Sequence, residues 1–143
     1  MYQADVAQIA FPVLCLSEDN SVCAFSSLGA LSRCNATSLF HNHYYDGLLI
    51  FDANGSCFAV AGADLVAHQS KLARLIARLV NKHFVVQLRI SRSPTLSFAE
   101  IKAMVLEWVH RTPDYWEASR DIGDWETSIS DASSVPDLVA LFA

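Results

Sequence analysis

Histidine and cysteine are the side chains of this 143-residue chain that could hold a metal. The closest pair is His41 and His43, separated by Asn42, with Cys34 or Cys57 as a third ligand. Metal sites use such clusters, but no fourth ligand stands at a recognisable spacing. We therefore predict no metal, and we interpret 41–43 as a polar loop whose histidines face solvent.

Catalysis by a nucleophile would need a cysteine or hydroxyl beside a base. Cys57 with His68 or His83 is the candidate pair, but Cys57 stands in an apolar run, where cysteine usually acts as a small hydrophobic residue. Asp46 and Asp52 could be paired carboxylates, yet Asp52 is better explained as a turn residue that bonds its own backbone. The chain also has no G-x-G-x-x-G, G-K-[ST] or G-x-S-x-G motif. We predict no catalytic site and no cofactor.

Length and composition indicate one compact domain over residues 1–143, without a need for a metal or disulfide to fold. Hydrophobic residues make up 52% and charged residues 17%, which implies a large core or some uncovered apolar surface. The N-terminus has no positive charge before an apolar run, and no apolar stretch approaches the ~20 residues of a membrane span. We expect a cytoplasmic protein without membrane contact.

The four cysteines form no C-x-x-C pair, which favours reduced thiols in a reducing compartment. Cys15 and Cys23 flank a turn that we place at residues 18–21. A two- or four-residue loop there would put their thiols on opposite faces of the hairpin, and only a three-residue loop would set them opposite each other. We expect no structural disulfide.

The hydrophobic pattern changes along the chain from strands to helices. Asn54-Gly55 between two apolar runs predicts a tight hairpin. Ser97 and Glu100 form a capping box before an amphipathic helix. Strands early and helices late predict an α+β fold, in which an antiparallel sheet of about five strands is covered by helices on one face. The expected strands are 11–16, 22–25, 48–51, 56–60 and 84–90, and the expected helices are 67–82, 98–109, 121–132 and one that begins near 134.

Charge is distributed unevenly. Residues 1–66 hold six acids and one base (−5), residues 67–95 six bases (+6), and residues 96–143 nine acids and three bases (−6), which sum to the net −5. The expected helix 67–82 carries a basic face, either a docking site or, as we favour, a solvated or internally paired face. The negative net charge argues against nucleic-acid binding. This secondary basic face comprises Lys71, Arg74, Arg78 and Lys82.

The acidic C-terminal third also carries aromatic residues. Carboxylates steer a basic partner to a surface, and aromatic side chains anchor it there. We therefore predict a partner-binding surface there; the alternative is that the tryptophans belong to the core. The predicted contact residues are Trp116, Glu117, Asp121 and Asp124.

Three segments carry a resemblance to a known class of proteins. They are LIFDANGSCFAVAGA (49–63), VVQLRI (85–90), and Trp116-Glu117 followed by a helix with Trp125 and a short terminal helix. In these segments the chain resembles small bacterial immunity-type proteins of polymorphic toxin systems. The resemblance implies a small, acidic, cytosolic, non-enzymatic protein that binds and neutralises a toxin domain. It implies no particular functional residue.

Three functions follow as hypotheses. The leading one is a non-enzymatic protein-binding domain, in the immunity case one that neutralises a basic toxin domain. The second is a small-molecule- or metal-binding domain or enzyme, with a pocket between sheet and helices and His41, His43, Tyr44 or Tyr45 at its mouth. The third is a self-associating structural protein such as a homodimer, suggested by the apolar composition.

Overall fold

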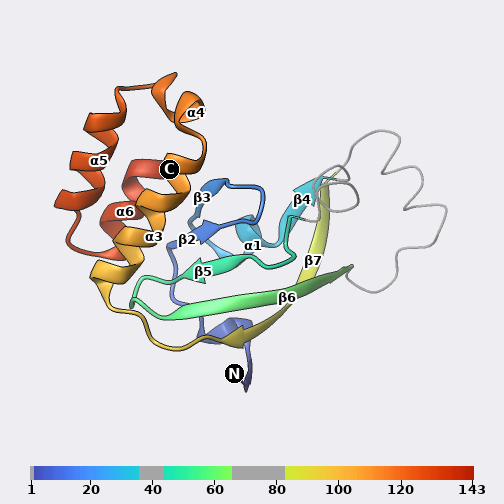
Figure 1. Ribbon diagram of the computed structural model, residues 1–143. Helices are drawn as coiled ribbons and strands as arrows, with labels where there is room; N and C mark the ends of the chain where they lie inside the picture. The colour runs from blue at the N-terminus through green and yellow to red at the C-terminus, as the bar shows by residue number, and fades with distance from the viewer. Residues whose placement is uncertain (1, 36–43, 66–82) are drawn as a thin grey trace.

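The computed structural model describes residues 2–35, 44–65 and 83–143 (Figure 1). The helix expected over 67–82, with its basic face Lys71, Arg74, Arg78 and Lys82, therefore lies outside the described residues. The same holds for the 41–43 motif.

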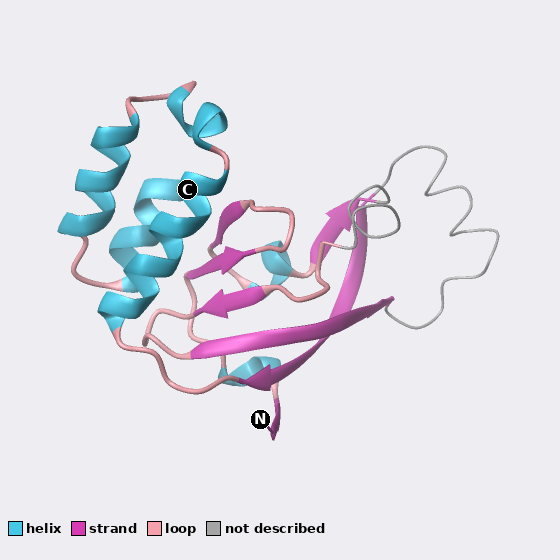
Figure 2. Ribbon diagram, in the orientation of Figure 1, coloured by secondary structure: helices cyan, strands magenta, loops and turns pink. Residues whose placement is uncertain are grey.

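The described residues form an α+β fold with strands first and the main helices last, as predicted (Figure 2). The five expected strands are confirmed, and two three-residue strands, β1 and β4, are added. Unlike the equally short β5, neither of them is a continuous apolar run, so the sequence carries no strand pattern there. The strands are β1 (Tyr2–Ala4), β2 (Val13–Leu16), β3 (Val22–Phe25), β4 (Arg33–Asn35), β5 (Leu49–Phe51), β6 (Cys57–Leu65) and β7 (His83–Arg92); the helices are η1 (Val6–Gln8), α1 (Leu28–Leu31), α3 (Phe98–Arg111), α4 (Pro113–Glu117), α5 (Ile122–Asp131) and α6 (Val135–Phe142).

All strand pairs are antiparallel, in the order β1-β7-β6-β5-β2-β3. Strand β4 lies off this path and pairs with β7, Arg33 opposite Val85. The chain thus passes from the β3 edge through α1 to a strand near the other edge. The sheet consequently curves, with α1 beside the space that it encloses (Figure 1).

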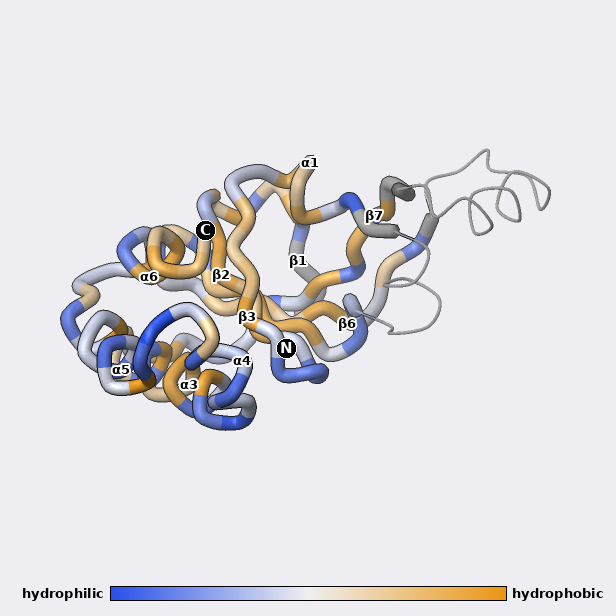
Figure 3. The backbone as a smooth tube through the Cα atoms, turned by 90° about the horizontal axis from the view of Figure 1, so that it is seen from above, coloured by the Kyte–Doolittle hydropathy of each residue, from blue (hydrophilic) through white to orange (hydrophobic). Residues whose placement is uncertain are grey.

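Strand β2 is buried completely on both faces and divides the core in two. Leu14 and Leu16 point to the first core cluster, which the helices α3 to α6 cover. Val13 and Cys15 point to the second core cluster, which the curved sheet, α1 and Tyr45 enclose. Figure 3 shows the hydrophobic β2 and β3 between the helices and the β7 side of the sheet.

The helical layer begins where the sequence predicted. The Ser97 Oγ accepts a hydrogen bond from the Glu100 N–H at 3.2 Å, and its hydroxyl donates to the Glu100 carboxylate at 3.1 Å. Helix α3 then buries Ile101, Val105 and Val109 at helical spacing. A second serine cap, Ser134, begins α6. The prediction of helices on one face of the sheet is confirmed for α3 to α6, whereas the four-residue α1 packs on the second core cluster.

Both short hairpins use a three-residue loop. In the β5–β6 loop, the Gly55 N–H donates to the Asp52 carbonyl at 2.9 Å, and Gly55 has φ of 83°, a left-handed value that glycine adopts without strain. In the β2–β3 loop, the Asn20 N–H donates to the Ser17 carbonyl at 3.2 Å, and Asn20 has φ of 69°. A turn followed by one left-handed residue is the common three-residue hairpin loop.

The β2–β3 loop places Cys15 directly opposite Cys23. The turn that we placed at four residues, 18–21, is therefore one residue shorter, because the Ser17 N–H already bonds to the Ser21 carbonyl at 3.1 Å. The two- and four-residue loops, which would have put the thiols on opposite faces, are wrong for this hairpin. Cys15, Cys23 and Cys57 are free thiols in this structure.

Asp52 joins the β5–β6 hairpin to the N-terminal segment. Its carboxylate is 1% exposed and accepts three backbone hydrogen bonds, from Asn54 (3.0 Å), Ser56 (2.9 Å) and Ala10 (3.1 Å). The turn role predicted for this residue is confirmed.

We expect Asp52→Ala to lower the free energy of unfolding by about 3 kcal/mol, because it leaves backbone donors at a buried site without an acceptor. Urea unfolding, followed by circular dichroism, measures the change. The control Asp131→Ala removes an exposed carboxylate and should shift stability by less than about 0.5 kcal/mol. Equal stabilities of the two variants would show that the Asp52 bonds contribute nothing net.

Candidate functional site

Helix α4 forms a short ridge between α3 and α5, made of Asp114, Tyr115, Trp116 and Glu117. Pro113 begins the helix, where its missing N–H costs nothing. The carbonyl of Trp116 accepts a hydrogen bond from the Trp125 Nε1 at 3.0 Å, which fixes the ridge on α5.

Trp116 lies in the core and not on the surface, which corrects its predicted role as a direct partner contact. Its side chain is 8% exposed. The ring packs edge-on against Trp125, with centroids 5.1 Å apart, and against Phe142 at 5.4 Å. The alternative recognised from sequence, that the tryptophans are core residues, holds for both Trp116 and Trp125.

Tyr115 takes the exposed position instead. It is 71% exposed, and Leu28, at 36%, is the other large apolar residue that the described surface leaves uncovered. The Tyr115 ring stands edge-on against the Trp116 ring at 4.9 Å. An exposed aromatic ring is thus supported from behind by a buried one. Tyr115 is not among the contact residues predicted from the sequence. A five-residue helix is too short for its hydrophobic period to show whether Tyr115 or Trp116 faces inward.

Two hollows flank the ridge, and Tyr115 and Trp116 line both. The first, about 260 Å³, lies toward the β2–β3 loop and includes Asp19 and Cys23. The second, about 380 Å³, lies toward the end of α6 and includes Phe142. Tyr115 therefore stands between two concave areas, a shape that a complementary surface can fit.

The β2–β3 wall of the first hollow is fixed to α3. The Trp108 Nε1 donates to the Ser17 carbonyl at 2.8 Å. The Arg111 guanidinium lies over the Trp108 ring, 3.8 Å from its centroid, and donates to Glu107 at 3.0 Å. Because the loop is tied to the helix that precedes α4, the hollow has a defined shape.

Carboxylates surround the ridge. The carboxylates of Asp114, Glu117 and Asp124 are exposed and have no ion-pair or hydrogen-bond partner within the described part of the chain. Asp121, also exposed, caps α5 by accepting from the Gly123 N–H at 3.1 Å. The predicted residues Glu117, Asp121 and Asp124 are therefore all at the surface within one short stretch around the α4–α5 connection. Their electrostatic field favours a positively charged ligand.

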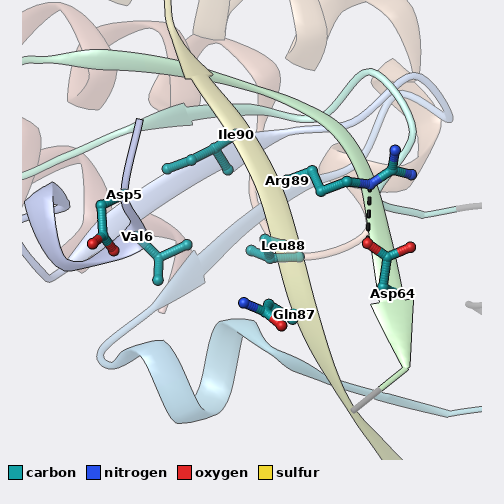
Figure 4. Close-up of a pocket in the computed structure, with 7 residues that line it drawn as sticks. All are labelled: Asp5, Val6, Asp64, Gln87, Leu88, Arg89 and Ile90. Atoms are coloured by element: carbon teal, nitrogen blue, oxygen red, sulfur yellow. Dashed lines mark ion pairs between the residues drawn. The ribbon is translucent and has the colours of Figure 1, made fainter. Parts of the chain in front are cut away.

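Another hollow, about 590 Å³, lies elsewhere, over β7 (Figure 4). Arg89 and Asp64 form an ion pair at 3.1 Å there, with both side chains more than half exposed, so solvent screens the pair. In Figure 4, β7 runs between the Asp64 carboxylate and the Asp5 carboxylate, so the two acids are not paired. Among the described residues that line this hollow, there is no histidine or cysteine.

Of the residues considered for a pocket mouth, His41 and His43 lie outside the described residues, and Tyr44 and Tyr45 pack in the structure. Tyr45 is 2% exposed, and its hydroxyl donates to the Leu31 carbonyl at 2.7 Å. Tyr44 packs against the second core cluster. Burial raises the pKa of the Cys57 thiol, which keeps it protonated and unreactive. Among the described residues, no three His, Cys, Asp or Glu side chains are grouped to hold a metal ion.

Comparison of the chain with protein-family models, with curated proteins and with solved structures gives no match. A search of the described helices likewise finds none with the length and apolar character that a bilayer crossing requires. Function must therefore be argued from the geometry of the α4 ridge and its surroundings.

The Asp19 carboxylate, in the wall of the first hollow, predicts a pH dependence of stability. Partial burial works to raise its pKa, but hydrogen bonds from the Ser17 and Ser21 hydroxyls and from backbone N–H groups outweigh this and lower the pKa. A pKa below the unfolded value of about 3.9 gives stability that is present above that pH and is lost as pH falls through the folded pKa.

We therefore expect Asp19→Asn to be less stable than the wild type near neutral pH, with a difference that shrinks below about pH 4. Urea unfolding at neutral pH and near pH 3 measures this. A difference that stays the same at both pH values would show that the hydrogen bonds to Asp19 do not depend on its charge.

Proposed function

We propose that this chain is a non-enzymatic protein-binding domain that docks its partner on the α4 ridge. The observation that carries the proposal is Tyr115, 71% exposed yet supported by the buried Trp116 and flanked by hollows on both sides. Tyrosine and tryptophan are the residues most enriched where binding energy concentrates. A supported ring also loses little side-chain freedom on binding, which favours affinity.

Charge supports a basic partner. The protein carries a net charge of −5, and Asp114, Glu117 and Asp124 surround the ridge without cations of their own within the described residues. Opposite charges on two surfaces accelerate their encounter and disfavour wrong partners. An arginine- or lysine-rich surface with a concave site for Tyr115 fits this description.

The resemblance to immunity-type proteins makes this partner, in our proposal, a toxin domain that the chain neutralises by covering it. Such a function needs a tight complex and no chemistry. A nanomolar complex requires about −12 kcal/mol. A standard interface buries roughly 800 Å² on each partner, about a tenth of the 7893 Å² of accessible surface here.

The test begins with capture of the tagged protein from its host cells and identification of a stoichiometric partner by mass spectrometry. The affinity of that purified partner is then measured for two variants. Tyr115→Ala should weaken binding about 30-fold or more, because it removes the anchor. Glu117→Lys should also weaken binding, by a larger factor at low salt than at high salt, because salt screens the interaction between exposed charges.

Two matched controls locate the effect. Leu28→Ala truncates the other exposed apolar side chain, and Asp131→Lys makes the same charge reversal on α5. Both should bind as the wild type does. If Tyr115→Ala and Glu117→Lys, shown to be folded by circular dichroism, also keep wild-type affinity, the α4 ridge is not the docking surface.

Self-association is the second candidate, favoured by one observation. Leu28 lines an apolar hollow of about 380 Å³ with Val6, Val86 and Leu88. If two copies meet there, the wild type should sediment as a dimer at micromolar concentration and Leu28→Asp as a monomer. A monomeric wild type would rule out this contact.

A further inference from the structure

Cys15 and Cys23 face each other across β2 and β3. Residues directly opposite in an antiparallel pair project from the same face of the sheet, with Cβ atoms about 4.5–5.5 Å apart. A disulfide needs Cβ atoms about 3.5–4.5 Å apart and Cα atoms within about 6.8 Å. The register therefore brings the two thiols to within a small adjustment of bonding distance.

The surroundings of the two thiols differ. Cys15 is fully buried in the second core cluster, whereas Cys23 is half-buried on the neighbouring strand β3. Burial above all, and Cys23 beside it, raise the pKa of the Cys15 thiol. A dissolved reagent therefore reaches the Cys23 thiol first, and the Cys15 thiol lies buried next to it.

Tyr44 adds a polar group to this pair. Its hydroxyl is buried without a nitrogen or oxygen partner. Burial, followed by the neighbouring Cys23 and Cys15, raises its pKa, so it remains a protonated donor beside the two sulfurs. A sulfur is only a weak acceptor. A donor left without a strong acceptor costs free energy, and an oxygen atom added to Cys23 would supply one.

We propose that Cys15 and Cys23 form a site of reversible oxidation, in which a small hydroperoxide converts the two thiols to a cross-strand disulfide. The Cys23 sulfur, as thiolate, attacks the terminal oxygen of the peroxide, and the O–O bond breaks. The leaving oxyanion takes a proton from solvent and departs as water from hydrogen peroxide, or as an alcohol from an alkyl hydroperoxide. Cys23 is now a sulfenic acid, whose oxygen accepts a hydrogen bond from the Tyr44 hydroxyl.

The Cys15 sulfur then attacks the Cys23 sulfur while the Cys15 proton passes to the sulfenic oxygen. The S–S bond forms, the S–O bond breaks, and that oxygen leaves as water. With hydrogen peroxide the balance is two thiols and one peroxide to one disulfide and two waters. The two electrons that the sulfurs lose reduce the O–O bond. A thiol such as dithiothreitol reverses the reaction by exchange.

The decisive experiment treats the reduced, full-length protein with hydrogen peroxide and maps its peptides without reduction. We expect the intact mass to fall by two hydrogen atoms and a single linked peptide to join Cys15 to Cys23, with both changes reversed by dithiothreitol. A variant that keeps only these two cysteines, Cys34→Ser with Cys57→Ala, should behave in the same way.

Two further variants test the order of steps. In Cys15→Ala the sulfenic acid at Cys23 has no resolving thiol, so dimedone should label Cys23. Tyr44→Phe should slow the formation of the linked peptide. The wild-type map decides the proposal even if a variant fails to fold. Cys23 carried to sulfinic or sulfonic acid, left unmodified, or linked to another cysteine would overturn it. Because no binding partner enters the assay, the result is independent of the proposed docking function.

Discussion

The burial of β2 on both faces is the constraint on which the rest of the structure depends. Its four residues alternate between the two core clusters. Leu14 and Leu16 pack against the helical layer, and Val13 and Cys15 pack in the second core cluster. A shift by one residue would exchange these sets. The β2–β3 and β5–β6 hairpin loops hold this register, together with the hydrogen bond from Trp108 to Ser17.

Polar groups at chain reversals do much of this holding. The buried Asp52 carboxylate bonds three backbone N–H groups from two separate segments. In the other hairpin, the Ser17 Oγ and the Asp19 carboxylate both accept from the Ser21 N–H at 3.1 Å. Side chains that take the place of missing ladder bonds let both loops remain three residues long. Loop length, in turn, determines which residues stand opposite each other across the sheet.

Segments with an apolar pattern or a turn signal could be predicted from the sequence, and segments with neither could not. Strands β6 and β7 and the C-terminal helices have enough residues to show a pattern, the shorter β2, β3 and β5 are apolar runs beside turn residues, and Ser97 and Ser134 mark two helix starts. Strands β1 and β4, at three residues each, form because β7 offers a free edge, which is a tertiary cause. For the same reason, the acidic surface around α4 could be predicted from the sequence, but the exposure of Tyr115 on that surface could not. Packing against Phe142, distant in the chain, turns Trp116 inward and leaves Tyr115 outside.

The distribution of tryptophan has a consequence for spectroscopy. The chain's three tryptophans, Trp108, Trp116 and Trp125, all lie in α3, α4 and α5. None belongs to the second core cluster, whose aromatic members are phenylalanine and tyrosine. Intrinsic tryptophan emission therefore reports on the helical layer and, through the Trp108 bond to Ser17, on the β2–β3 loop, but not on the second core cluster. Cations above two of the indole rings, Arg111 over Trp108 and Arg120 over Trp125, make that emission sensitive to whatever approaches the helices from outside.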